Sequence, residues 1–263
     1  MKRKLQALLV ILLLGVLKLP VEQHATRYLR EAALLSPPLD MGVREHIGQM
    51  GFAASLGGLR SLVASITYLQ AYQAWTNVDW GKVDSYFQLT TSLQPRYDRY
   101  WEEAAWHMAY NAAASYLNNQ ELNAAVRGKL FHDHIQRGGD ILRQGLRVLP
   151  DSVRLWNALA ELYERRTHEP KKAGDSYMEV LRLTGNLRIA RFAAYQYALT
   201  SDPELWQKAY ELLKQSYDKN QRPPTLINTL KQLENQLRLP ADRRIPEAFV
   251  PVEMPAREPS APR

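Results

Sequence analysis

Residues 150–163 read PDSVRLWNALAELY, and residues 95–108 read PRYDRYWEEAAWHM. In each segment a proline is followed six positions later by a tryptophan, at Trp156 and at Trp101. Small or large apolar residues then recur at the third, fourth and seventh positions after each tryptophan. This spacing places them on one face of a helix, and the proline ends the helix before it. The two segments therefore predict repeated helix–turn–helix units, an architecture whose broad surfaces typically bind other molecules.

The placement of proline extends this prediction to the rest of the chain. Between Leu39 and Arg222 there are only four prolines, and a proline within a helix costs about 3 kcal/mol, so these four mark helix ends. No stretch shows the sustained alternation that is typical of strands, which makes the expected fold class all-α. Apolar spacing predicts helices over 22–35, 43–55, 59–76, 82–93, 99–116, 131–149, 153–165, 173–183, 187–199, 203–217 and 224–239. Asn118-Asn119 and Arg127-Gly128 are expected to flank a long connection.

The N-terminus predicts a transmembrane helix. Basic residues at positions 2–4 precede an apolar stretch of 17 residues from Leu5 to Val21, which is long enough to cross a bilayer. No pair of small residues with the spacing of a signal-peptide cleavage site follows before Pro38, so an uncleaved anchor is favoured over a cleaved signal peptide or a buried helix. The positive-inside rule then places the N-terminus in the cytoplasm and the remaining chain in the periplasm of a bacterium.

Composition excludes several classes of chemistry. The chain has no cysteine, which excludes disulfides, zinc–thiolate sites and cysteine nucleophiles. The formal net charge is +7, but residues 1–20 alone contribute +4 and residues 240–263 contribute none. The remaining basic residues form no cluster, so no nucleic-acid partner is expected.

These features divide the chain into four parts. We expect a transmembrane signal-anchor over 1–21, a membrane-proximal linker with short helices over 22–55, and a helical repeat domain over 56–239. Residues 240–263 contain six prolines and no apolar periodicity. They predict an extended, mobile tail, or a proline-rich segment that orders on a partner.

The segment 150–185 resembles a tetratricopeptide repeat. The residues that match its two helices are Trp156, Leu159, Ala160 and Tyr163, followed by Ala173, Tyr177 and Val180 after a one-residue insertion. The unit headed by Trp101 matches in part through Ala104 and Ala105, then Gly138, Leu142 and Gly145. The resemblance implies an α-solenoid of antiparallel helix pairs.

Residues 56–111 carry a second resemblance. The sequences LGGLRSLVASITYLQAYQAW and LQPRYDRYWEEAAWHMAYNAA look like a segment of membrane-anchored, repeat-containing bacterial envelope proteins. This resemblance implies an architecture and a location, and it implies no mechanism.

In repeats of this kind the first helix of each pair lines the concave face. Counted from the two tryptophans, the outward positions are Arg99, Glu102 and Trp106, and Arg154, Asn157 and Glu161. Polar residues beside an aromatic suit the recognition of an extended chain or a partner helix. Residues 68–116 also hold 12 of the 25 aromatic residues, which indicates dense core packing or an exposed surface for a peptide, a helix or a glycan.

Candidate chemistry is sparse. His132 and His134 would point in different directions on a helix, so no shared metal and no cofactor is expected. Glu102 and Glu103 diverge by about 100° on a helix, which favours two surface carboxylates over a catalytic pair. A buried Arg60 would need a carboxylate partner.

The sequence therefore favours a scaffold or assembly subunit of an inner-membrane complex. It would contact the bilayer through residues 5–21 and bind partner proteins from the periplasmic side. The first alternative is an envelope module that binds a glycan or a peptide through the aromatic-rich face. The second alternative is an enzyme of unknown type.

Overall fold

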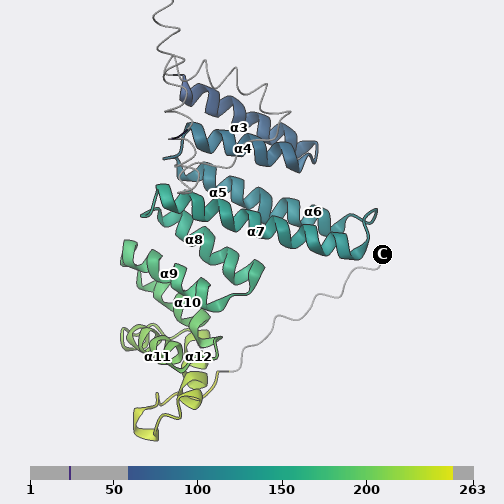
Figure 1. The fold of residues 1–263 in the computed structure, drawn as a ribbon. Helices are drawn as coiled ribbons and strands as arrows, with labels where there is room; N and C mark the ends of the chain where they lie inside the picture. Colours follow the sequence, from purple (N-terminus) through teal and green to yellow (C-terminus); the bar gives the residue numbers. More distant parts are fainter. Residues whose placement is uncertain (1–23, 25–58, 251–263) are drawn as a thin grey trace, which may run out of the picture. The chain divides into compact units, whose positions relative to one another are not determined.

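The computed structural model describes His24 and residues 59–250, and all regular structure among these residues is helical (Figure 1). The helices are α3 (Arg60–Thr76), α4 (Trp80–Leu93), α5 (Asp98–Trp106), α6 (Ala113–Asn118), α7 (Ala124–Val148), α8 (Val153–Leu162), α9 (Pro170–Thr184), α10 (Leu187–Ala198), α11 (Pro203–Asp218) and α12 (Pro224–Gln236). The prediction of an all-α chain is confirmed for this part. The expected anchor over 1–21 and the expected helices over 22–35 and 43–55 lie outside the described residues.

None of the described helices combines the length and the apolar character needed to cross a bilayer.

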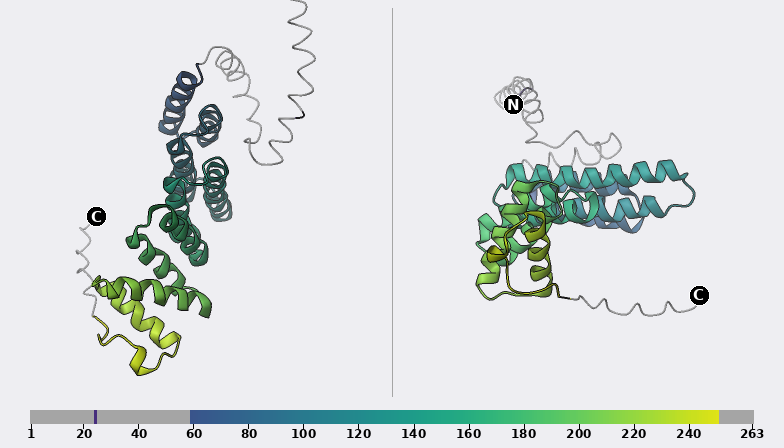
Figure 2. Two further views of the ribbon diagram at one scale, coloured as in Figure 1. Left: turned by 90° about the vertical axis from the view of Figure 1, so that its left-hand side faces the viewer. Right: turned by 90° about the horizontal axis from the view of Figure 1, so that it is seen from below.

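The described residues form two compact units whose boundary falls within α8, between Leu155 and Trp156. In the first unit α3 packs on α4, and α7 packs along α5 and α6. In the second unit α9 packs on α10, α10 on α11, and α11 on α12. The views in Figures 1 and 2 agree in showing α7 alongside α5 and α6 over most of its length.

Helix starts follow the local sequence. Asn123 caps α7 by accepting a hydrogen bond from the Val126 amide, and Asp202 caps α11 in the same way through the Glu204 amide. Proline is the first residue of α9, α11 and α12, where its missing amide hydrogen has no intrahelical partner to lose.

The region around residues 118–128 differs from the sequence prediction. Helices α5 and α6 are joined without a break by a π-helical turn, η1 (His107–Ala112), and α7 begins at Ala124 rather than at residue 131. The connection is therefore short, and Gly128 lies within a helix. The Arg127-Gly128 pair misled the prediction because a glycine that costs about 1 kcal/mol is tolerated when the rest of a long helix is packed.

The proline-to-tryptophan spacing has a structural cause. The Trp101 indole Nε1 donates a hydrogen bond to the Pro95 carbonyl oxygen, six residues earlier, at 2.9 Å. Trp206 makes the same contact with the Thr200 carbonyl at 2.7 Å. Trp101, Trp156 and Trp206 are each the fourth residue of their helix. The carbonyl six residues earlier, rather than proline itself, is the common acceptor, so the proline-to-tryptophan spacing did not reveal that α11 repeats this contact.

Helix α3 buries a different face from the one that its sequence suggests. Its buried residues are Val63, Ala64, Thr67, Ala71 and Ala74. The Thr67 and Thr90 hydroxyls, which are 2.8 Å apart, share a buried hydrogen bond between α3 and α4. The larger apolar residues from which we predicted the helix are exposed: Leu59, Leu62, Ile66 and Leu69, at 48%, 54%, 37% and 66%. Small residues face α4 because they let the two helices approach closely.

Arg60 is also exposed, so the buried arginine considered from the sequence does not occur. Asp84 of α4, a carboxylate that could have paired with a buried Arg60, pairs with Arg137 of α7 at 2.9 Å.

The first residues of the predicted tail are not separate from the helical domain. Residues Ala241–Arg243 form a single 3-10 turn, and Ile245 is buried with the core residues of α11 and α12. We expected residues 240–263 to be extended and mobile, or to order only on a partner, but residues 240–250 lie against helices of their own chain. Their contacts with side chains of α11 and α12 hold them there.

Two glycines set the distance between α5 and α7. A Cβ atom placed on Gly138 would lie 2.6 Å from the Ala109 Cβ and 2.8 Å from the Ala105 carbonyl oxygen. A Cβ atom on Gly145 would lie 2.9 Å from the Trp101 Cγ. Both glycines therefore lie at close contacts between helices of the first unit.

Replacing Gly138 with alanine should therefore destabilise the chain, and replacing Gly128 should not. At Gly138 the added methyl meets backbone, so we expect the free energy of unfolding to fall by about 1–3 kcal/mol. At Gly128 a Cβ atom meets nothing within 4 Å, and alanine should raise the free energy of unfolding by about 0.5–1 kcal/mol. Urea unfolding followed by circular dichroism measures both. Equal effects of the two substitutions would show that α5 and α7 are not in tight contact.

Candidate recognition surface

The six residues predicted to face a partner lie on α5 and α8, and most of them pair within the chain. Arg154 donates to Glu102 at 2.7 Å and approaches Asp98 at 3.6 Å, which joins the start of α8 to α5. This hydrogen bond with Glu102 raises the pKa of Arg154. Because both side chains remain partly exposed, the pair contributes at most about 1 kcal/mol to stability.

Arg99 and Glu103 form a second ion pair. The Arg99 Nε donates to the Glu103 Oε1 at 2.6 Å, and the Tyr68 hydroxyl donates to the Glu103 Oε2 at 2.5 Å. Burial first, and then the bond to Glu103, raise the pKa of Tyr68. Glu102 therefore turns toward α8 while Glu103 turns toward α3, so the prediction that these two carboxylates diverge is confirmed.

Asn157 and Glu161 belong to the second unit. The Asn157 Nδ2 donates to the Glu161 Oε1, one helical turn later, at 3.0 Å. The structure therefore divides the six predicted residues between the units, with Arg154 in the first and Asn157 in the second.

Trp106, the one aromatic residue among the six, is 47% exposed. It lies beside a buried histidine, His107. We call His107 and the four rings around it the His107 cluster. Ring centroids lie 5.1–5.6 Å from the His107 centroid and belong to Trp106, Trp75, Phe87 and Tyr72. The cluster draws on α3, α4, α5 and η1, so it links the first two helices to the helix that runs from α5 into η1.

His107 itself is 1% exposed. Its Nδ1 lies 3.1 Å from the Asn111 Nδ2, which donates to it and leaves the imidazole proton on Nε2. No hydrogen-bond acceptor in the described residues faces Nε2, and aromatic rings surround the imidazole. Burial lowers the pKa of His107, and the negative charge of Glu103 opposes this shift weakly.

Ring contacts continue from this cluster to a second exposed aromatic residue, Tyr97. Tyr72 contacts Tyr68 at 5.1 Å, Tyr68 contacts Tyr100 at 5.2 Å, and Tyr100 contacts Tyr97 at 4.6 Å between centroids. Tyr97 is 46% exposed. We call this series, from Tyr97 to Trp106, the aromatic row. The sequence left core packing and an exposed surface as alternatives, and the aromatic row combines them, because its middle is packed and both ends are open to solvent.

Sequence reasoning missed His107. Its position between Trp106 and Met108 gave no signal of function. Apart from Trp106, the rings that surround it come from α3 and α4. Only their packing brings them together.

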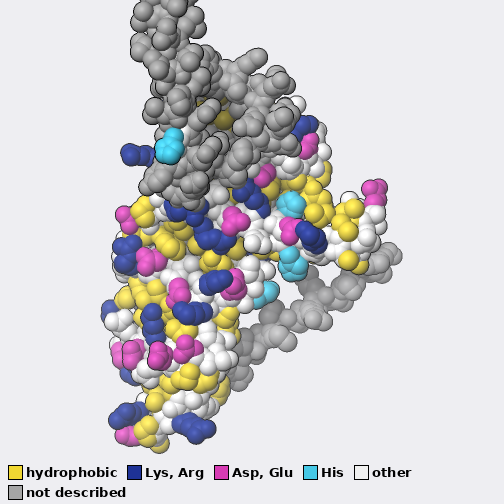
Figure 3. All heavy atoms as spheres, in the orientation of Figure 1, with side chains coloured by type: hydrophobic (Ala, Val, Ile, Leu, Met, Phe, Trp, Pro, Cys, Tyr) yellow, Lys and Arg dark blue, Asp and Glu magenta, His cyan; other side chains and the backbone are white. Residues whose placement is uncertain are grey.

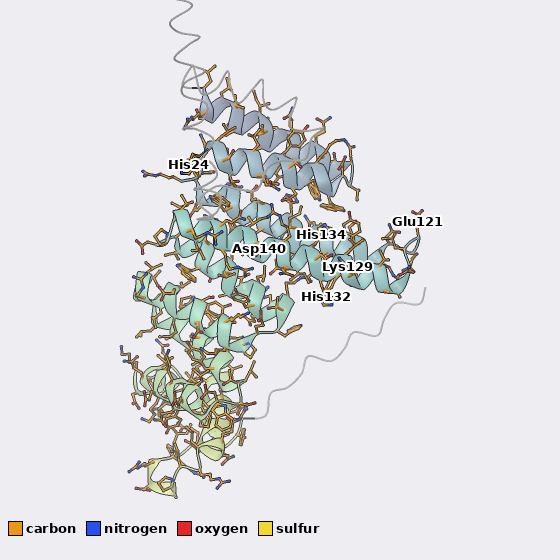
Figure 4. The ribbon with its side chains drawn as sticks, in the orientation of Figure 1. His24, Glu121, Lys129, His132, His134 and Asp140 are labelled. Carbon is orange, nitrogen blue, oxygen red and sulfur yellow. The ribbon has the colours of Figure 1, made fainter. Side chains whose placement is uncertain are left out.

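The other histidines among residues 59–250 lie apart from the His107 cluster. Figure 4 places His132 and His134 along α7 and Glu121 at the end of the hairpin that joins α6 to α7. His134 stacks on Tyr116 with 4.7 Å between centroids, and its Nδ1 lies 2.8 Å from the Leu130 carbonyl oxygen. Among the described residues, no three histidine or acidic side chains could hold one metal ion.

Charge is mixed on the face of the molecule that Figure 3 shows. Lysine and arginine side chains alternate there with aspartate and glutamate over the described helices. Such a surface favours contacts of specific shape over non-specific attraction to a polyanion.

The chain matches no protein-family model, and no curated protein aligns with it.

The stability of the first unit should depend on pH through His107. The folded chain holds this ring neutral below its ordinary pKa of 6.5, whereas the unfolded chain protonates it near 6.5. The unfolded state therefore binds more protons in the window just below 6.5, and the free energy of unfolding should fall as the pH falls through it. A His107→Phe variant should lose this part of the slope, and a His132→Gln variant should keep it. Urea unfolding between pH 5 and pH 8 measures the slopes, and equal slopes in all three proteins would contradict the assignment.

Proposed function

We propose that this protein is a membrane-anchored scaffold or assembly subunit, whose helical domain binds partner proteins of an inner-membrane complex from the periplasmic side. Residues 5–21 anchor it in the bilayer of a bacterium, as the basic head and the apolar stretch that follows it suggest.

The exposed stripe on α3 carries this proposal. Leu59, Leu62, Ile66 and Leu69 are separated by three, four and three positions, which is the spacing of the contact seam in paired helices. The opposite face of α3 is already packed on α4. Four large apolar side chains exposed on one helical face are typical of a protein–protein contact. The spacing matches a partner helix better than an extended chain, because a helix presents apolar residues with the same period.

The α3 stripe lies in the part of the domain nearest the anchor along the chain. A surface at this position suits a partner that is itself held in the same membrane, since both are then confined near the bilayer. We therefore assign the partner as a subunit of a membrane complex.

The internal repeat supports a tetratricopeptide-like arrangement of this domain. Helices α5, α8 and α11 each have a tryptophan as their fourth residue. Three or four positions after each tryptophan lies buried alanine: Ala104 and Ala105 in α5, Ala160 in α8 and Ala209 in α11. Small residues at recurring positions let successive helices stack. On this basis we propose a solenoid of helix pairs over 56–239.

The aromatic row favours a second candidate function, the binding of a glycan or a peptide. Trp106 and Tyr97 are 47% and 46% exposed, and aromatic faces bind sugars and apolar side chains through stacking. Cell-wall fragments should then shift the tryptophan fluorescence of the full chain, and a Trp106→Ala variant should lose this shift.

The α3 stripe can be tested by charge substitution. Leu62→Glu and Leu69→Glu together should reduce the recovery of a stoichiometric membrane partner at least tenfold in a pull-down from mild detergent. Leu199→Glu is a matched control, because Leu199 is a leucine exposed at 67% on the other unit. Circular dichroism should show unchanged helix content in all variants. Undiminished recovery of the partner with the double variant would remove the α3 stripe from the proposal.

The topology has a separate test. A reporter that is active only in the periplasm should work when it is fused to the C-terminus, and one that is active only in the cytoplasm should not. The opposite pattern would reverse the proposed orientation.

A further inference from the structure

Residues 244–250, which read RIPEAFV, lie as an extended segment against α11 and α12. Side chains of these two helices hold the segment at three successive points. Two of these points hold a residue by its backbone groups, and one binds a carboxylate. Together they define what the surface of α11 and α12 beneath the segment, which we call the groove, can bind.

The first point holds both backbone groups of one residue. The Glu234 carboxylate accepts a hydrogen bond from the Ile245 amide at 2.7 Å, and the Lys231 ammonium donates to the Ile245 carbonyl oxygen. Lys231 and Glu234 also pair with each other at 3.1 Å. Glu234 is fully buried, and a buried carboxylate is costly unless it is paired and hydrogen-bonded. The incoming amide of residue 245 therefore completes the set of partners of a buried charge.

The second point reads a carboxylate. The Tyr217 hydroxyl lies 2.6 Å from both oxygens of Glu247, and Arg222 donates to the same carboxylate at 3.1 Å. The Arg222 guanidinium also lies 4.3 Å from the centre of the Tyr217 ring, which fixes the donor pair. Lys214 stands 5.4 Å from the same ring centre. This end of the groove is cationic and complements an acidic residue.

The third point again holds one residue by its backbone. The Asn228 Nδ2 donates to the Val250 carbonyl oxygen, and its Oδ1 accepts from the Val250 amide, both at 2.8 Å. Asn228, Lys231 and Glu234 are spaced three residues apart along α12, so they lie in a line on one face of the helix.

Apolar contact adds to these three points. Ile245 is 4% exposed and belongs to the core of the second unit, and Val250 packs against that core. Pro246, Ala248 and Phe249 are exposed, so they contribute little to the contact.

We propose that the groove between α11 and α12 is a binding site for an extended segment of a partner protein, and that residues 244–250 occupy it as an exchangeable intramolecular ligand. The partner segment carries an apolar residue, an acidic residue two positions later and an apolar residue three positions after that. Charge complementarity between Glu247 and the cationic end of the groove selects the acidic position. Main-chain recognition by Lys231, Glu234 and Asn228 leaves the intervening positions free.

This site is separate from the α3 stripe and from the aromatic row. It therefore stands or falls independently of the proposed function.

The test uses the full chain with the segment weakened and the groove intact. In an Ile245→Ala, Glu247→Ala double variant, the groove residues are unchanged. A fluorescein-labelled synthetic peptide of sequence RIPEAFV should bind this variant at least tenfold more tightly than it binds the wild-type chain, in which the tethered segment competes at a high effective concentration. Fluorescence anisotropy measures both affinities.

Two further variants check that the peptide enters the groove. Adding Asn228→Ala to the double variant should weaken peptide binding at least tenfold. Adding Gln232→Ala, which changes an exposed residue of the same helix, should not alter it. A peptide with alanine in place of its glutamate should also bind at least tenfold more weakly. A folded double variant that fails to bind RIPEAFV would overturn the proposal.

If the double variant does not fold, amide hydrogen exchange of the wild-type chain tests whether residues 244–250 leave the groove. The Ile245 and Val250 amides should exchange at least a hundredfold faster than the Leu230 amide within α12, because the segment would open while the helices stay formed. Equal protection would show that the segment is a fixed part of the fold and would also overturn the proposal. If the wild-type chain forms a dimer and the double variant does not, the groove binds a second copy of this chain instead of a partner protein.

Discussion

The close approach of α5 and α7 is the constraint on which the first unit depends. Gly138 has no room for a side chain because Ala105 and Ala109 lie directly against it. This contact fixes the rotation of the helix that runs from α5 through η1. The π-helical turn begins at His107 and includes Ala109, so the same stretch of chain both closes the contact with α7 and presents His107 to the rings of α3 and α4. Such turns often occur where a side chain is placed for a specific purpose.

Two kinds of surface result from this packing. On α3 the small residues pack against α4, and the large apolar residues of the opposite face remain exposed. Along the aromatic row, rings pack on one another in the interior and emerge at Tyr97 and Trp106. Both surfaces suit recognition, whereas the ionisable groups of the first unit mostly pair with one another. The function proposed above rests on this contrast.

The feature that distinguishes the second unit is a buried carboxylate, that of Glu234. In α12 the buried Glu234 pairs with Lys231, and the Ile245 amide donates a further hydrogen bond to its carboxylate. After α12, residues 244–250 lie against α11 and α12 as an extended segment. An extended segment held largely by its backbone is easier to exchange than a packed helix, because it buries few side chains.

The sequence by itself determined the all-α fold class and most helix positions, because proline placement and apolar spacing are local properties of the chain. It also predicted that Glu102 and Glu103 diverge, since this follows from helix geometry. Only the tertiary structure decided which face of α3 is buried, because small and large residues formed two competing faces and packing on α4 selected the small one. Only packing assembled the His107 cluster and seated residues 244–250 on α12, since these contacts join residues that lie far apart in the chain.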